Sequence, residues 1–174
     1  DVTTVSRRAQ RLQDAAAAVS VLTSEDIRRS GATSIPEALR LVPGVHVARI
    51  DANKWSVSVR GFTGRYANKL LVLVDGRSVY TPLWSGVVWD LVNIPLNTIE
   101  RIEVIRGPGA TLWGANAVNG VINIITRSAS AYQGIHLTAA TGSEDRGMFS
   151  LSGGRPLSAA TALRVDASGS VIDG

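Results

Sequence analysis

The chain has 174 residues, 45% of them hydrophobic, a length that supports one domain with its own core plus additional elements. It lacks cysteine, which excludes disulfides, thiolate metal sites and cysteine nucleophiles, and its two histidines, His46 and His136, argue against a histidine-rich metal site. The net charge is +4, but the few aromatic residues are not interleaved with basic ones, so we expect no nucleic-acid partner.

The N-terminal residues 1–18 start with the β-prone "DVTTVS" and continue without a clear apolar period, which indicates an extended lead-in. The chain starts at Asp1 rather than at a methionine, so we expect a processed or trimmed N-terminus. The longest apolar run, "LLVLV" at 70–74, is far shorter than the ~20 residues of a membrane-spanning helix. A membrane role would therefore depend on β-strands or on a partner.

Two short helices are predicted next. "VSVLT" is typical of a short strand, and the following "SEDIRRSG" predicts a helix with Ser24 as N-cap and Gly31 as its stop. Ser34 and Glu37 predict a capping box for a second helix, which ends at Pro43-Gly44.

From Val45 the apolar residues recur with a period of two, which predicts a sheet. "VHVARI" and "WSVSVRGF" alternate, "LLVLVDG" is almost wholly apolar, and Asp75-Gly76 is a hairpin turn signal before "RSVYT". "TIERIEVIRG" and "GVINIITR" supply two more strands. Residues 19–127 therefore predict a small α+β unit.

After residue 128 the character of the sequence changes. "GIHLTAATG", "RGMFSLSGG" and "TALRVDASGS" alternate small or polar residues with apolar ones, over about the ~9 to 11 residues that a tilted barrel strand uses to cross a bilayer. Outer-membrane barrels need at least ~8 strands, so these three predict the front of an incomplete barrel.

The glycine-rich stretch "RGPGATLWGANAVNG" lies between the two last strands of the α+β unit. Gly109 and Gly114 have the spacing of a phosphate-binding loop, but Ala115-Asn116 replaces its Lys-Ser/Thr and no helix pattern follows. Turns with positive φ and close backbone approach are sufficient to explain the glycines.

Four segments, in this order, resemble the plug domain of TonB-dependent outer-membrane receptors. They are "EDIRRSGATSIPEALRLVPGVHV", "VSVRGF", "LLVLVDG" and "IERIEVIRGPGATLWGANAVNGVINIITR". In this family the plug fills a barrel of roughly 22 strands, so the glycine-rich stretch is expected to be backbone folded tightly inside a barrel.

The resemblance implies a fold class, an α+β plug domain with a small mixed sheet and short helices, followed by antiparallel β-strands of an incomplete outer-membrane β-barrel. The expected boundaries are 1–18 for a TonB-box-like segment and linker, 19–128 for the plug domain, and 129–174 for the first strands of a truncated barrel.

The resemblance also assigns a partner to the N-terminus. The segment Asp1, Val2, Thr3, Thr4 and Val5 resembles the TonB box, the extended peptide that the periplasmic domain of TonB captures, and strand addition suits such a segment. The alternative is an ordinary disordered terminus.

Arg60 and Arg106 match the two plug arginines that pair with barrel glutamates in some family members, as a lock between the plug and its own barrel domain. A buried guanidinium needs a carboxylate partner. The alternative is pairing within the plug, to Glu100 or Glu103.

The substrate contacts of the family come from plug loops that face outward. The matching positions combine aromatic, amide and arginine side chains, which suit a flat, oxygen-rich and often anionic chelate. The alternative is that the tryptophans anchor loops or touch the barrel wall. The candidates are Asn53, Trp55, Arg65, Tyr66, Asn68, Tyr80, Trp84 and Trp89.

The expected function is that of a plug that binds a scarce nutrient chelate, such as a ferric siderophore or cobalamin, and couples its uptake to TonB. The expected location is the outer membrane, with the N-terminus in the periplasm. We expect no enzyme, metal site or cofactor, because Glu100 and Glu103 point to opposite faces of a strand and no G-x-S-x-G motif occurs. The alternative function is a non-transporting periplasmic interaction module with a plug-like fold.

Overall fold

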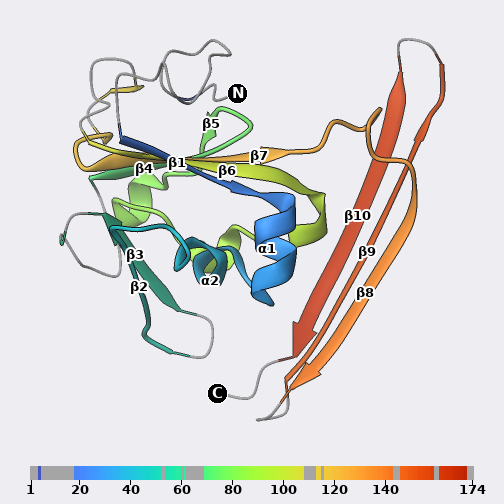
Figure 1. Ribbon diagram of the computed structural model, residues 1–174, viewed down its shortest axis with the longest axis horizontal. Coiled ribbons are helices and arrows are strands. Elements are labelled where there is room, and N and C mark those ends of the chain that lie inside the picture. Colours follow the sequence, from blue (N-terminus) through green and yellow to red (C-terminus); the bar gives the residue numbers. More distant parts are fainter. Residues whose placement is uncertain are drawn as a thin grey trace.

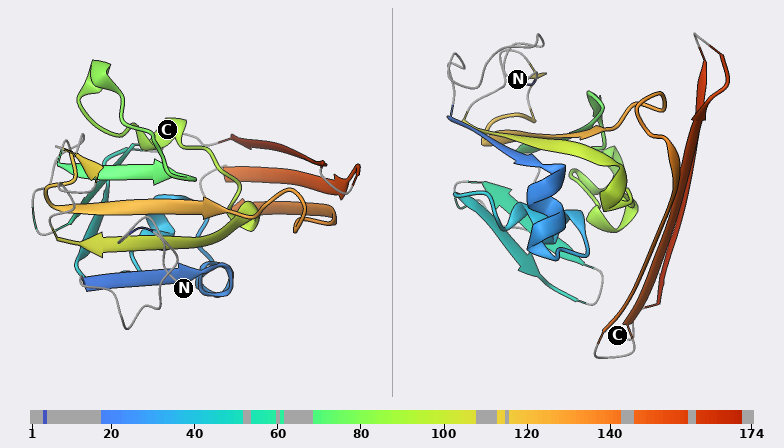
Figure 2. Two further views of the ribbon diagram at one scale, coloured as in Figure 1. Left: turned by 90° about the horizontal axis from the view of Figure 1, so that it is seen from above. Right: turned by 45° about the vertical axis from the view of Figure 1, so that its right-hand side comes forward.

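Three β-sheets and a few short helices make up the described part of the chain (Figure 1). The computed structural model describes residues 4, 18–51, 54–59, 61, 69–107, 113, 114, 116–142, 146–158 and 161–171. A five-stranded sheet has helices on one side and the N-terminus on the other, and a long three-stranded sheet stands beside both (Figures 1 and 2).

The first strand, β1 (Ala18–Thr23), leads directly into α1 (Ser24–Ser30). The N-cap is Thr23 rather than the predicted Ser24: the Asp26 N–H donates to Thr23 Oγ1, and the Asp26 carboxylate accepts from the Thr23 N–H in return. Hydrogen bonds from the Thr23 side chain and backbone to this carboxylate lower the pKa of Asp26. Gly31, with φ of 69°, ends the helix as predicted.

The second helix, α2 (Ile35–Leu39), has Ser34 as its N-cap, as predicted. Only half of the predicted capping box forms. Ser34 Oγ accepts from the Glu37 N–H at 3.4 Å, but the Glu37 carboxylate accepts from the N–H and hydroxyl of Thr33, at 2.8 and 2.6 Å. A second hydroxyl one residue before the cap competes for the carboxylate.

The first two of the predicted strands after Val45 form a separate two-stranded sheet, and the next two lie at one edge of the five-stranded sheet. β2 (Val45–Arg49) pairs with β3 (Trp55–Val59), separate from the main sheet. β4 (Leu70–Val74) turns at Asp75-Gly76, where both residues have positive φ, as the turn signal predicted. The strand after it, β5 (Arg77–Ser78), is shorter than the "RSVYT" pattern suggested.

The centre of the main sheet is the pair β6 (Ile99–Arg106) and β7 (Gly120–Thr126). The strand order is β1-β6-β7-β4-β5; the β4–β7 pair is parallel and the other pairs are antiparallel. Three single-turn 3₁₀ helices, η2 (Pro82–Trp84), η3 (Trp89–Leu91) and η4 (Leu96–Thr98), connect β5 to β6. The predicted small mixed sheet with short helices is confirmed.

Both faces of this sheet are covered. On the helix side, Leu70, Val72, Ile102, Val104 and the β7 residues 122 and 124 join a core with α1 and α2. On the other side, residues 71, 73, 105, 117 and 121 form a second apolar cluster, with Trp113 packed against it. Because side chains alternate along a strand, a strand buried on both faces is continuously apolar, which explains "LLVLV".

The long three-stranded sheet follows the plug-like part. β8 (Gly134–Gly142), β9 (Arg146–Pro156) and β10 (Ala162–Val171) form antiparallel neighbours, in the predicted segments. In their register the odd-numbered positions share one face, where Ile135, Leu137 and Val165 are more than half exposed. The even-numbered positions, mainly small or polar, form the other face.

No helix among the described residues has the length and apolar character needed to cross a membrane.

The glycine-rich connection between β6 and β7 explains the sequence stretch that resembled a phosphate loop. Gly107 and Gly114 have φ of 148° and 92°, in the region that favours glycine. Gly120 is required for a different reason: a Cβ there would lie 2.6 Å from the backbone oxygen of Ile105. The expectation of turns and close backbone approach is confirmed at these positions.

We predict that Gly120→Ala lowers the free energy of unfolding by about 1–3 kcal/mol, because the new methyl group forces β6 and β7 apart. Thermal unfolding of the purified protein, followed by circular dichroism, measures the change. Gly147→Ala is the matched control, since a Cβ at position 147 meets nothing within 4 Å. Equal midpoints for both variants would contradict the close approach.

Candidate functional site

Thr4, in the N-terminal segment, is fully buried on the sheet face opposite the helices. Its N–H and hydroxyl both donate to Glu103 Oε2, at 2.8 and 2.6 Å. The Asn123 amide donates to the Thr4 hydroxyl at 3.1 Å, and the Trp113 indole N–H donates to the Thr4 carbonyl at 2.8 Å. Every polar group of this residue is therefore held by the plug; we call these four residues the Thr4 clamp.

The centre of the clamp is the carboxylate of Glu103, which has no exposed surface. Glu103 lies opposite Asn123 in the β6–β7 ladder, so the two polar side chains emerge together on the same face. Arg101 pairs with Glu103 Oε1 at 2.9 Å and also with Glu100. This charge balance lets a carboxylate remain buried, where an unpaired one would be strongly destabilising.

Sequence reasoning missed Glu103, Asn123 and Trp113 as functional residues. A signal was available, because Glu103 and Asn123 interrupt otherwise apolar strands, "RIEVIR" and "GVINIIT". A polar residue in a strand buried on both faces requires a partner. The partner could not be inferred, because it lies 99 residues away from Glu103.

The predicted arginine pair is only partly described. Arg106 Nη1 donates to the Pro43 carbonyl at 3.1 Å, and its Nε is buried without a hydrogen-bond partner among the described residues. The printed contacts of Glu100 and Glu103 with an arginine are those of Arg101, and the described contact of Arg106 is with Pro43. Arg60 lies outside the described residues.

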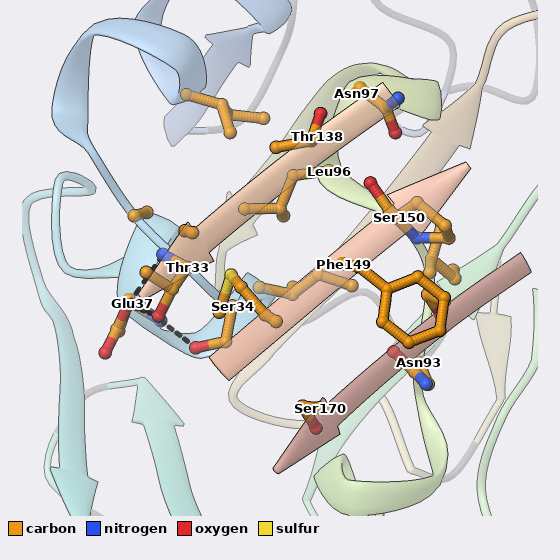
Figure 3. A pocket seen from close by; sticks show the side chains of 18 of the residues that line it. Thr33, Ser34, Glu37, Asn93, Leu96, Asn97, Thr138, Phe149, Ser150 and Ser170 are labelled. Carbon is orange, nitrogen blue, oxygen red and sulfur yellow. Dashed lines mark hydrogen bonds between the residues drawn. The ribbon is translucent and has the colours of Figure 1, made fainter. Parts of the chain in front are cut away.

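A cavity of about 1080 Å³ lies on the helix side, between the plug helices and the inner face of β8–β10 (Figure 3). Figure 3 shows Thr33, Ser34 and Glu37 near α2 on one side, and Thr138 and Ser150 on the strands. Most of the labelled side chains carry hydroxyl or amide groups. The full lining also includes apolar and charged side chains, among them Ile94, Met148, Arg49 and Asp90.

The structure brings two of the predicted substrate residues, Trp55 and Trp89, to this cavity. Trp55 is half-buried, and the guanidinium groups of Arg40 and Arg49 lie 5.6 and 5.5 Å from its ring centre. Trp89 is only 6% exposed and belongs to the core, as the loop-anchor alternative predicted for tryptophans.

The other predicted substrate residues are not brought to this cavity. Tyr80 and Trp84 are described but do not line it; Trp84 ends η2 and is 50% exposed. The rest of the set lies outside the described residues: Asn53, Arg65, Tyr66 and Asn68, and likewise Asp1, Val2, Thr3 and Val5 of the N-terminal segment.

The described residues have no arrangement suited to acid–base or metal chemistry. Glu100 is exposed and Glu103 buried, and Arg101 binds both. Within the described ranges no three His, Cys, Asp or Glu residues group closely enough to hold a metal ion. The described structure holds Thr4 on one face of the main sheet and has a cavity on the other.

Comparison with known proteins agrees with this architecture. A family model described as the TonB-dependent Receptor Plug Domain matches residues 11–121. The chain belongs to this plug family. The predicted family and fold class are therefore confirmed.

Two curated relatives of this chain have different names. The "Vitamin B12 transporter BtuB" of Vibrio vulnificus is 36% identical over 82% of this chain and 23% of its own length. The "Iron-regulated outer membrane virulence protein" of Vibrio cholerae is 37% identical over 94% of this chain and 26% of its own. The chain thus spans about a quarter of the length of these curated relatives. Their names describe a transporter and an outer-membrane protein, in agreement with the prediction that the chain is not an enzyme.

Solved structures similar to this plug domain are receptors as well. The ferric-catecholate import receptor Fiu from E. coli K12 superposes with a TM-score of 0.70, at 26% identity over 91% of this chain and 22% of Fiu. The siderophore receptor PirA from Pseudomonas aeruginosa gives 0.59, at 32% identity over 87% of this chain and 28% of PirA.

We predict that Thr4→Val loosens the hold of the sheet on position 4. The valine side chain has the same shape but can neither donate to Glu103 nor accept from Asn123, so only the hydrogen bonds of the backbone N–H and C=O remain. Buried polar groups left unpaired cost about 1–3 kcal/mol, so protease cleavage within residues 5–17 should become roughly tenfold faster or more. Thr33→Val is the matched control, since it removes the hydroxyl of an exposed threonine that donates to Glu37 at the same 2.6 Å. Unchanged cleavage in Thr4→Val would contradict the clamp.

Proposed function

We propose that this chain forms the plug and first barrel strands of an outer-membrane receptor that takes up a scarce nutrient chelate with energy supplied through TonB. The observation that carries the proposal is the Thr4 clamp, within a chain whose family is the TonB-dependent receptor plug. A peptide that is to be captured by a partner must be held reversibly, and hydrogen bonds provide this because their net contribution is only about 0.5–1.5 kcal/mol each.

The N-terminal segment 1–5 is proposed to be the TonB box. Thr4 is bound through its N–H and its C=O, the groups that a partner strand would use in strand addition. Binding of Thr4 to the plug and binding of Thr4 to TonB therefore exclude each other, because the same backbone groups cannot bind both. A substrate would promote capture only if it binds the released state more tightly than the clamped state.

The proposed substrate is a ferric siderophore, cobalamin or a similar chelate. The arginine-flanked ring of Trp55, on a cavity that combines apolar, hydroxyl, amide and arginine side chains, supports this class, since such groups bind flat, oxygen-rich molecules. The names of the relatives, which mention vitamin B12, iron and ferric catecholate, support the same class. The other candidate side chains belong to the same proposal: Asn53, Arg65, Tyr66, Asn68, Tyr80, Trp84 and Trp89.

The proposed organisation is a box and linker at 1–18, a plug at 19–128 and barrel strands at 129–174. The last strand of the five-stranded sheet ends at Thr126 and β8 begins at Gly134, which supports this division. Arg60 and Arg106 are proposed to lock the plug to its barrel, and the buried, unpartnered Nε of Arg106 supports a carboxylate partner there. The proposed location is the outer membrane, with the N-terminus periplasmic.

We predict that Val5→Pro abolishes TonB binding and substrate uptake without unfolding the plug, because proline removes a backbone N–H that strand addition needs. Uptake of radiolabelled cyanocobalamin and of ferric siderophores is measured in cells of the native source, in which the natural protein carries either no change or one of the substitutions. Binding to the purified periplasmic domain of TonB is measured in parallel. Val5→Thr is the control, since it keeps the N–H and the branched shape.

Two results would count against these assignments. Uptake by Val5→Pro equal to the unchanged protein would refute the assignment of segment 1–5 as the TonB box. A natural protein that binds a periplasmic partner, takes up none of the substrates and is absent from outer-membrane fractions would instead support the non-transporting module.

A further inference from the structure

Tyr132 lies in the link between β7 and β8, the only stretch of chain that joins the five-stranded sheet to the long three-stranded one. The N–H groups of residues 131 and 132 both donate to the Ser128 carbonyl at 3.1 Å, which makes the link a tight turn. The turn leaves the Tyr132 side chain only 2% exposed, although it belongs to neither sheet. A buried aromatic ring at such a junction has to be held by groups from both sides.

The ring and hydroxyl of Tyr132 do contact both sides. From the plug, Asn97 of η4 donates its amide to the Tyr132 hydroxyl at 3.2 Å, and the same amide lies 3.5 Å from Ser152 Oγ on β9. From the strands, the His136 ring lies at 4.9 Å and the Arg164 guanidinium at 5.9 Å from the Tyr132 ring centre. Ser152 is fully buried, so the contact excludes water.

Arg164 adds a second connection across the same junction. Its guanidinium donates from Nη1 to the backbone carbonyl of Arg127, one residue after β7, and pairs with Asp166 at 2.9 Å. Arg164 and Asp166 are both on β10. A charged pair of the three-stranded sheet therefore contacts the backbone at the end of β7 in the five-stranded sheet.

Gly154 on β9 shows how closely the tyrosine fits. A Cβ at this position would lie 2.3 Å from the Tyr132 carbonyl oxygen and 3.3 Å from Tyr132 Cδ1. At the neighbouring Gly153 the nearest atoms would be 3.9 Å away, an ordinary contact. Only one of two adjacent glycines is therefore required by the tyrosine.

This cluster lies at the opposite end of β6 and β7 from the point where the N-terminal segment enters. β1 begins opposite Arg106, at the end of β6, whereas η4 precedes Ile99 at its beginning, and Arg127 follows the paired Thr126. Eight residues of strand separate the two ends, roughly 25 Å. A force applied through the N-terminus meets the Thr4 clamp first, then the edge strand β1, and this cluster last in the order of the chain.

We propose that Asn97, Tyr132, Ser152 and Arg164 form a fixed anchor, which holds the far end of the plug on the barrel wall while the N-terminal end is released and pulled. The inference rests on the proposed transport function. Its consequence is that the plug does not leave its seat as one rigid body. Tyr132 and Asn97 act as positioning residues, through the contact between the plug and β9.

Because the chain has no cysteine, two engineered pairs can compare the anchor with the Thr4 clamp. Asn97→Cys with Ser152→Cys, and Thr4→Cys with Asn123→Cys, are each bridged in the natural protein in its own envelope by the same short, reducible bifunctional thiol reagent. The bridged anchor pair is expected to keep uptake within about twofold of the unbridged protein. The bridged clamp pair is expected to lose uptake and to regain it on reduction. Loss of uptake in the bridged anchor pair, reversed by reduction, would overturn the proposal.

A second measurement does not depend on uptake. A thiol at Ser152→Cys is expected to react slowly with a water-soluble maleimide, about tenfold faster or more after Gly154→Ala, and at the slow rate after Gly153→Ala. Fast reaction without either glycine change would overturn the anchor even in a protein that transports nothing. Failure of uptake in every unbridged protein, with slow labelling retained, would refute the transport function and leave the seating of Tyr132 supported.

Discussion

A carboxylate that is buried in the middle of a β-sheet must be matched by hydrogen-bond donors, and at Glu103 this requirement determines how the N-terminus lies. Arg101 balances the charge from the same strand, but one guanidinium contact does not satisfy both oxygens. The second oxygen accepts from the N–H and hydroxyl of Thr4. Thr4 supplies these two donors from one residue, its backbone N–H and its hydroxyl.

The two faces of the five-stranded sheet are covered by different kinds of contact. The helix face is covered by an apolar core, whose exposure to water would cost roughly 25 cal/mol for every Å². The opposite face carries a polar pair, Glu103 and Asn123, above a smaller apolar cluster. Hydrogen bonds contribute less net free energy there than the apolar core does on the helix face, which supports the proposal that the segment containing Thr4 is released from this face.

The local structure was largely predictable because local rules determine it. The Asp75-Gly76 turn formed as expected, since few residues other than glycine and aspartate adopt two successive positive φ values. The helix caps were predicted to within one residue. Ser24 was expected as a cap but Thr23 serves, and Glu37 binds Thr33 instead of Ser34, because adjacent hydroxyl residues compete for one carboxylate and the backbone entry angle decides between them.

The candidate site was less predictable than the fold. The sequence led to the predictions that Thr4 belongs to a peptide captured by a partner and that Trp55 contacts substrate, and both stay predictions. It could not show that Thr4 binds Glu103, or that Tyr132 is buried at a junction, because these contacts join residues separated by many positions. Nor could it assign Glu100 and Glu103 to Arg101, which depends on the exposure of each side chain.

The amino-acid sequence by itself determined the periods of two in the strands, the helix ends, the glycine-dependent turns and the family. These follow from backbone sterics and from the alternation of side chains, which act over a few residues. Only the tertiary structure decided which polar groups became buried together. The register of β6 against β7 places Glu103 beside Asn123, and the packing of the three-stranded sheet closes Tyr132 in place. Burial then makes each polar group depend on a partner that is distant along the chain.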